Sequence, residues 1–206
     1  KPAGTTTVDL RACLGTSGIC DTNTDALIYV PPGNIDMVLV HDASGSMGWI
    51  DVPGDLPRLE QAKRAAELLV MLAQAGDAYG VMDFSAKDDP PGCAPNCPHD
   101  VQVVYPKTAI TDPAAQIPAL VAAINGMTDR EWTNLGEGLR RAQLMVLGTP
   151  YSANNKIVTL LSDGEENVKP YYDEIAADLS VVVNTMGFSG DAPNDLLARI
   201  AAENLG

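Results

Sequence analysis

Residues 35–47 read IDMVLVHDASGSM, and this stretch predicts both the fold and the position of the chemistry. Its first part, Ile35–Val40, is a nearly continuous apolar run, which is typical of a strand buried on both faces of a parallel sheet. Its second part carries Asp42, Ser44 and Ser46 at every second position, with a glycine between the serines. A strand that runs out into a tight loop can turn these side chains toward one point. Their oxygens suit Mg²⁺, Ca²⁺ or Mn²⁺ rather than zinc.

The rest of the chain alternates between strand-like and helix-like patterns. We expect helices at 55–75, 112–126, 135–147, 171–178 and 193–203, and further strands at 77–85, 101–105, 156–161 and 180–186. No helical pattern separates 77–85 from 101–105, so these two strands are expected to form an antiparallel hairpin at the sheet edge. The alternation predicts an α/β fold over residues 35–206. We expect a doubly wound, mostly parallel central sheet with one antiparallel edge strand and helices on both faces.

Residues 1–34 form an extension that is too short to be a domain. We expect strands at Thr5–Leu10 and Ala26–Val30, and packing of this segment against the main body. The chain begins at Lys1 without a visible signal peptide, as a mature or excised fragment would.

The charge and the hydropathy of the chain exclude two classes of partner. With 27 acidic and 13 basic residues the formal net charge is -14, which argues against nucleic acid and anionic membranes as partners. The apolar runs are far shorter than the roughly 20 residues of a membrane-spanning helix, so no membrane insertion is expected.

Four cysteines fall in two close pairs, Cys13 with Cys20 and Cys93 with Cys97. Three connectivities are possible, and local pairing is the simplest. A zinc site is the alternative, but a short C-x-x-C motif is missing and the chain has just two histidines. Disulfides favour an oxidising location: extracellular, cell-surface or periplasmic.

Two further loops carry oxygen ligands. Asp163 follows the 156–161 strand, and Thr133 lies in the polar segment 128–134 before a helix. Ligands of open α/β sheets bind at the carboxyl ends of the strands. If the strands before Asp42 and Asp163 are neighbours, the two acids face the same spot.

The three loops together resemble those of a von Willebrand factor type A domain. The resemblance is carried by DASGSM at 42–47, TNLGEGL at 133–139 and LLSDGEEN at 160–167, and it covers residues 35–206. TNLGEGLRRA, LLSDGEEN and VNTMGFSGDAPNDLLARIAAE are also similar to the A domain of calcium-activated chloride channel regulators and their prokaryotic relatives. The family has one more edge strand after the 193–203 helix. We expect that strand to be missing here, with Ala26–Val30 covering the edge or the chain being truncated.

The resemblance implies a metal-ion-dependent adhesion site (MIDAS) with one divalent cation, Mg²⁺ first and Ca²⁺ or Mn²⁺ as alternatives. Ser44, Ser46 and Thr133 match the hydroxyls that touch the metal, and Asp42 and Asp163 match the acids that hold it, often through water. So few charged ligands leave a coordination position open for an acidic residue of a partner protein.

Three functions remain open. A metal-dependent protein-binding or adhesion module is favoured over a metal-stabilised structural module of a larger secreted or surface protein. A metal-dependent hydrolase is the third, but the chain has no G-x-S-x-G motif and neither histidine lies in a triad motif. We therefore expect no enzyme activity. Trp49 and Trp132 flank the predicted site; they either form an apolar rim for a partner or pack the loops.

Overall fold

The computed structural model describes residues 10–14, 19–23, 33–87, 92–148, 154–188 and 195–206. Contacts divide the chain into two compact units, residues 1–33 and 34–206. In the first unit, β1 (Leu10–Leu14) pairs with β2 (Ile19–Asn23) in antiparallel register. The expected strand at 26–30 lies outside the described residues, as does 5–10 except for Leu10, where β1 begins. Packing of this unit on the main domain stays a prediction.

Cys13 and Cys20 lie directly opposite each other in the ladder between β1 and β2. Cα atoms at opposing positions of antiparallel strands are about 4.5–5.5 Å apart, within the range that a disulfide spans. The side chains of this unit lie outside the described part of the structure, so the Cys13–Cys20 disulfide stays a prediction. Its backbone register is compatible with the bond.

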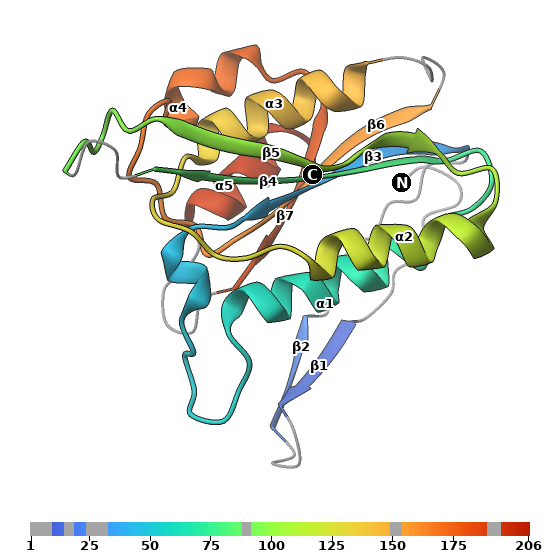
Figure 1. The fold of residues 1–206 in the computed structure, drawn as a ribbon, viewed down its shortest axis with the longest axis horizontal. Coiled ribbons are helices and arrows are strands. Elements are labelled where there is room, and N and C mark those ends of the chain that lie inside the picture. Colours follow the sequence, from blue (N-terminus) through green and yellow to red (C-terminus); the bar gives the residue numbers. More distant parts are fainter. Residues whose placement is uncertain (1–9, 15–18, 24–32, 88–91, 149–153, 189–194) are drawn as a thin grey trace. The chain divides into compact units, whose positions relative to one another are not determined.

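The second unit is built on a five-stranded sheet with the order β5-β4-β3-β6-β7 (Figure 1). The strands are β3 (Ile35–Asp42), β4 (Ala78–Ala86), β5 (His99–Ala109), β6 (Asn155–Ser162) and β7 (Val182–Gly187). Neighbouring strands run parallel except β5, which pairs with β4 in antiparallel orientation at one edge. The predicted fold class is confirmed.

Helices cover both faces of this sheet (Figure 1). One face carries α1 (Arg58–Val70) and α2 (Pro113–Asn125); the other carries α3 (Leu135–Leu147), α4 (Tyr172–Ile175) and α5 (Asp195–Glu203). Side chains alternate along a strand, so Leu39 packs toward α1 while Val38 and Val40 pack toward α3. This double burial explains why the β3 sequence is a continuous apolar run.

Three elements differ from the sequence prediction. Helix α1 spans Arg58–Val70 rather than 55–75. It begins later because residues 49–57 form a loop that is closed by the Arg58 N–H donating to the Trp49 carbonyl (3.0 Å), and it ends earlier because residues 71–73 form turns in which Leu72 and Ala73 donate to carbonyls three residues back. Strand β5 continues past Pro106, which an edge strand tolerates because, among the described strands, β5 pairs with β4 alone and has one side of its ladder open. The expected 171–178 helix is a single α-turn, α4, followed by a 3₁₀ turn, Ala176–Asp178.

The described part of the chain also bears on the predicted Cys93–Cys97 pair and on membrane-spanning helices. Cys93 and Cys97 form a disulfide, as expected. Among the described residues, no helix combines the length and the apolar character needed to span a bilayer.

Candidate metal centre

The two predicted metal-site acids lie at the carboxyl ends of neighbouring strands. Asp42 is the last residue of β3, Asp163 directly follows β6, and the two strands pair in parallel. The Ser162 hydroxyl donates to Asp42 Oδ2 at 2.6 Å, which ties the two strand ends together. Burial, and then the negative charge of Asp163, raise the pKa of Asp42 to about 7. The two carboxylates therefore share one buried region.

The loop after β3 gathers the oxygens of three residues. The Ser44 N–H donates to Asp42 Oδ1 (2.9 Å), which makes the Asx-type turn that this residue spacing favours. A 3₁₀ helix, Gly45–Gly48, follows, and it brings the hydroxyls of Ser44 and Ser46 to 3.1 Å from each other. The D-x-S-x-S spacing thus places its polar side chains side by side.

The Thr133 loop is joined by backbone hydrogen bonds to both other loops. Toward the first loop, the Gly45 N–H donates to the Glu131 carbonyl at 2.9 Å. A Cβ on Gly45 would lie 2.9 Å from the Arg130 carbonyl oxygen, so only glycine allows this close approach. Toward the third loop, the Thr133 N–H donates to Asn167 Oδ1 (2.7 Å), and the Thr133 carbonyl accepts the Val168 N–H (3.0 Å). Thr133 itself is buried.

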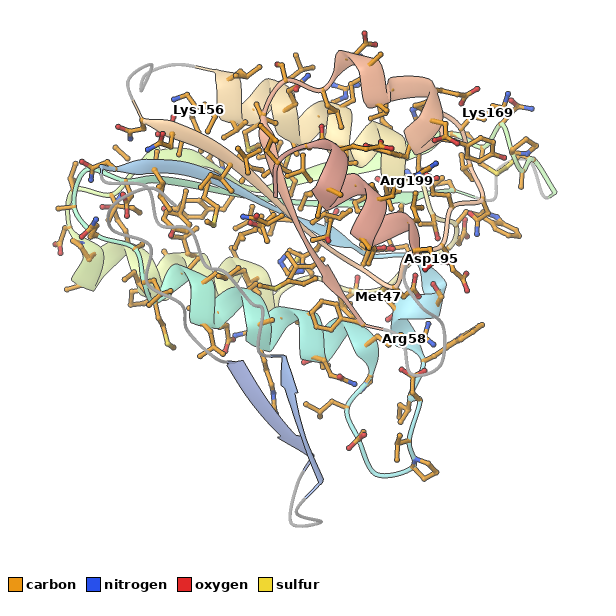
Figure 2. The ribbon with its side chains drawn as sticks, turned by 180° about the vertical axis from the view of Figure 1, so that it is seen from behind. Met47, Arg58, Lys156, Lys169, Asp195 and Arg199 are labelled. Atoms are coloured by element: carbon orange, nitrogen blue, oxygen red, sulfur yellow. A yellow bond between two sulfur atoms is a disulfide. The ribbon has the colours of Figure 1, made fainter. Side chains whose placement is uncertain are left out.

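Arg58 is a participant that the sequence interpretation missed. It lies at the start of α1, beside the turn that carries Met47 (Figure 2). Its Nη1 donates to Asp163 Oδ2 at 2.8 Å, and its Nη2 donates to Asp51 at 2.6 Å. Its guanidinium carbon lies 5.4 Å from the centre of the Trp49 ring. The hydrogen bonds to Asp51 are the main cause that raises the pKa of Arg58, so the side chain stays charged.

Arg130 anchors the Thr133 loop to strand β4. Its guanidinium donates to Asp83 at 2.7 Å and to the Ser85 hydroxyl at 2.8 Å, both on β4. Its backbone N–H donates to the carbonyl of Ala43, next to Asp42. One residue thus joins the loop to strand β4 and to the segment that directly follows β3. A basic residue in the acidic segment 128–134 is the signal that sequence reasoning could have used.

The Cys93–Cys97 disulfide belongs to an apolar cluster that includes residues of the Thr133 loop and of the loop after β6. Cys97 is buried in a small cluster with Ala86 and Val168, and Cys93 and Trp132 pack against that cluster. Trp132 therefore packs the loops, whereas Trp49 is 60% exposed beside Arg58. Of the two expected rim residues, Trp49 alone is largely exposed.

The donors at this edge fit a hard divalent cation. Two carboxylates and three hydroxyls are oxygen ligands. A cation would compensate the buried negative charge of Asp42, which burial and the nearby Asp163 make costly. Within the described ranges, no three His, Cys, Asp or Glu side chains are placed to share a metal ion. A set of two acids and three hydroxyls differs from such a cluster, and it is the set that the sequence predicts.

The sequence matches the family described as von Willebrand factor type A domain over residues 37–166, which is more than half of the chain. The chain belongs to this family. The matched segment contains all five predicted metal-site residues of this type A domain. A search of curated proteins found no match. The closer likeness to chloride channel regulators stays a prediction.

Solved structures share the type A fold. BatB from Bacteroides thetaiotaomicron, a conserved hypothetical protein, is 19% identical, with 84% of this chain and 88% of that chain covered and a TM-score of 0.61. A von Willebrand factor type A structure from Catenulispora acidiphila is 21% identical over 84% and 38%, with a TM-score of 0.63. Proximal thread matrix protein 1 from the mussel byssus, solved with a zinc-occupied MIDAS motif, is 21% identical over 82% and 39%, with a TM-score of 0.58. At these identities the likeness concerns the fold.

Proposed function

We propose that this type A domain is a divalent-metal-dependent protein-binding module. Asp42, Ser44, Ser46, Thr133 and Asp163 hold one cation, Mg²⁺ first and Ca²⁺ or Mn²⁺ as alternatives. The observation that carries the proposal is the placement of two buried carboxylates, Asp42 and Asp163, at the carboxyl ends of the paired strands β3 and β6, with the Ser44 and Ser46 hydroxyls in the adjoining loop. Asp163 is paired with Arg58, whereas the Asp42 carboxylate accepts from neutral donors, the Ser44 N–H and the Ser162 hydroxyl. A cation would compensate this buried negative charge, which is costly to leave unbalanced.

The cation would supply an open position for a carboxylate of a partner protein. The residues of the chain prepare that position: the hydroxyls of Ser44, Ser46 and Thr133 bring no charge, so two carboxylates are the acidic part of the set. Asp129 and Glu131 are exposed on the Thr133 loop, and Glu165 is exposed on the loop after β6. Their charge repels anions that do not reach the metal, which favours a partner whose acid enters the site itself.

Two other functions are weaker candidates. As a structural module, the domain would use the cation to stiffen its loops inside a larger protein. As a hydrolase, it would need Asp42 or Asp163 as a general acid or base, yet both acids are assigned to the metal. We therefore propose a non-enzymatic module. An extracellular, surface or periplasmic location is supported by the Cys93–Cys97 disulfide.

Calorimetry with Mg²⁺ and Mn²⁺ tests the metal site. The wild type should bind one ion, Asp42→Ala should abolish binding, and Asp55→Ala, which removes an exposed acid of the nearby 49–57 loop, should bind like the wild type. Equal affinity of the wild type and Asp42→Ala would show that the site is misassigned.

A binding experiment separates the adhesion module from the structural one. Peptides that carry a single Asp or Glu are compared with the same peptides carrying Asn or Gln, with Mg²⁺ and then with excess chelator. Binding that needs both the acid and the metal supports the adhesion module. Metal binding that raises thermal stability without any acid-dependent peptide binding supports the structural module.

A further inference from the structure

Arg58 is a buried cation in direct contact with one of the two metal-site acids. The side chain of Arg58 is 10% exposed and that of Asp163 is fully buried, with 2.8 Å between Nη1 and Oδ2. A buried Arg–carboxylate pair at this distance is a strong, charge-assisted hydrogen bond. Arg58 therefore acts on the charge that the site offers to a metal, and its effect is larger than that of a surface ion pair.

Asp163 has two oxygens with different surroundings. Oδ2 accepts the hydrogen bond of Arg58, whereas the contact recorded for Oδ1 is a long one, 3.4 Å from the Glu165 N–H. Oδ1 is thus the oxygen that remains to face a cation or its bound water. The charge of the carboxylate is shared over both oxygens, so the guanidinium on Oδ2 lowers the negative charge available at Oδ1.

We propose that Arg58 tunes the site, weakening its hold on the metal and strengthening its hold on the carboxylate of the partner. The inference rests on the proposed function. By compensating Asp163, Arg58 leaves more of the cation's positive charge unbalanced, and that charge attracts an anion from outside. Arg58 is a positioning residue in this role, since it acts through Asp163 and touches neither metal nor partner.

Asp51 limits the strength of this effect. It accepts hydrogen bonds from Nη2 (2.6 Å) and Nε (3.1 Å) of Arg58, on the side of the guanidinium away from Nη1. The charge of Arg58 is therefore divided between Asp51 and Asp163. Removing the charge of Asp51 should strengthen the influence of Arg58 on Asp163, which is the opposite of removing Arg58.

The first measurement is the affinity for Mn²⁺, followed by electron paramagnetic resonance of the free ion. Arg58→Gln removes the charge, and it should tighten Mn²⁺ binding roughly tenfold because a nearby positive charge no longer repels the ion. Arg58→Lys keeps the charge but cannot bond Asp51 and Asp163 as the guanidinium fork does, so its Mn²⁺ affinity should lie between those of the wild type and Arg58→Gln. Arg64→Gln removes an exposed charge from the next turn of the same helix, and it is the matched control.

The second measurement is the uptake of a carboxylate by the Mn²⁺-loaded protein. Acetate is the probe and acetamide its neutral control, with the relaxation of water protons reporting displacement of metal-bound water. Acetate should bind several-fold more weakly to Arg58→Gln than to the wild type. Asp51→Asn should show the reverse pair of changes, with weaker Mn²⁺ binding and stronger acetate binding.

Opposite changes of the two affinities are the signature of this role. If Arg58 merely anchors the 49–57 loop, Arg58→Gln will weaken both Mn²⁺ and acetate binding, or leave both unchanged, and the tuning role is refuted while the metal site stands. If the wild type binds Mn²⁺ but takes up no acetate, or binds no Mn²⁺, the proposed function fails and the inference fails with it. Thermal unfolding of each metal-free variant shows whether it is folded.

Discussion

His41 is a buried polar residue whose replacement should stabilise the domain. It lies on β3 next to Asp42, is fully buried, and has no hydrogen-bond partner on either ring nitrogen in the described structure. Burial is the main cause that lowers its pKa from 6.5 to about 3, with a smaller contribution from the positive charge of Lys63. The perturbation is His41→Leu, which keeps a side chain of similar size and removes both nitrogens.

The difference in unfolding free energy between His41→Leu and the wild type has a constant part and a pH-dependent part. Removing an unsatisfied buried polar group stabilises the fold by about 1–3 kcal/mol. The different shape of leucine destabilises it by up to about 1.5 kcal/mol. His41→Leu should therefore be about 1 kcal/mol more stable than the wild type at pH 8. The folded state of the wild type binds fewer protons at His41 than the unfolded state does between pH 6.5 and 3. The contribution of His41 to stability is therefore fully present above pH 6.5 and is lost as the pH falls below that value. This loss amounts to roughly 2–3 kcal/mol by pH 4.5.

Urea unfolding in the presence of chelator, at pH 8, 6.5, 5.5 and 4.5, measures both parts. The wild type and His41→Leu should differ by an amount that grows as the pH falls, because the contributions of Asp42 and of the other acids are common to both proteins. His99→Leu changes the other histidine, which is exposed, and should keep the pH profile of the wild type. A constant difference between pH 8 and 4.5, or a less stable His41→Leu at pH 8, would refute the reasoning.

Three further predictions concern the loops of the site. Replacing Cys93 and Cys97 together with serine should lower the free energy of unfolding by about 2 kcal/mol, measured by urea unfolding without reductant, because the disulfide closes a short loop. Gly45→Ala should weaken Mg²⁺ binding in calorimetry, since its Cβ would press on the Arg130 carbonyl at 2.9 Å, whereas Gly54→Ala, in open space but at φ +94°, should affect stability alone. Mn²⁺ affinity should rise with pH up to about 7, the pKa of Asp42. In the metal-free protein, the raised pKa of Asp42 contributes stability below pH 3.8 that is lost between 3.8 and 7.

The central sheet and most of its helices could be predicted because their signals are local. The apolar run of β3 and the caps of α2 and α3 are readable without knowledge of the fold; Asp112 and Asn134 each accept a backbone N–H of the first helical turn. The start of α1 was misplaced for the opposite reason. Its boundary follows from the 49–57 loop, which is closed by the Arg58 N–H donating to the Trp49 carbonyl, and the side chain of Arg58 also bonds Asp163, 105 positions away in sequence.

The five residues of the proposed site could be named from the sequence, but their supports could not. Spacing and resemblance identify Asp42, Ser44 and Ser46, since an Asx turn and a short 3₁₀ helix are properties of the local sequence. Nothing in the local sequence distinguishes Arg58 and Arg130 from surface charges. Their contacts with Asp163 and Asp83 depend on which loops the strand order brings together.

Hydrogen bonds between protein groups hold the loops of the site together. Ser162 holds Asp42, Arg58 holds Asp163, and Asn167 holds the backbone of Thr133. A site assembled in this way would lose little conformational entropy on binding a cation, which would favour binding even through weak hydroxyl ligands. The same hydrogen bonds occupy part of each carboxylate, which limits how much cation charge the protein compensates. If the last ligand of the cation is to come from another protein, the loops must be ordered while part of the cation's positive charge stays uncompensated.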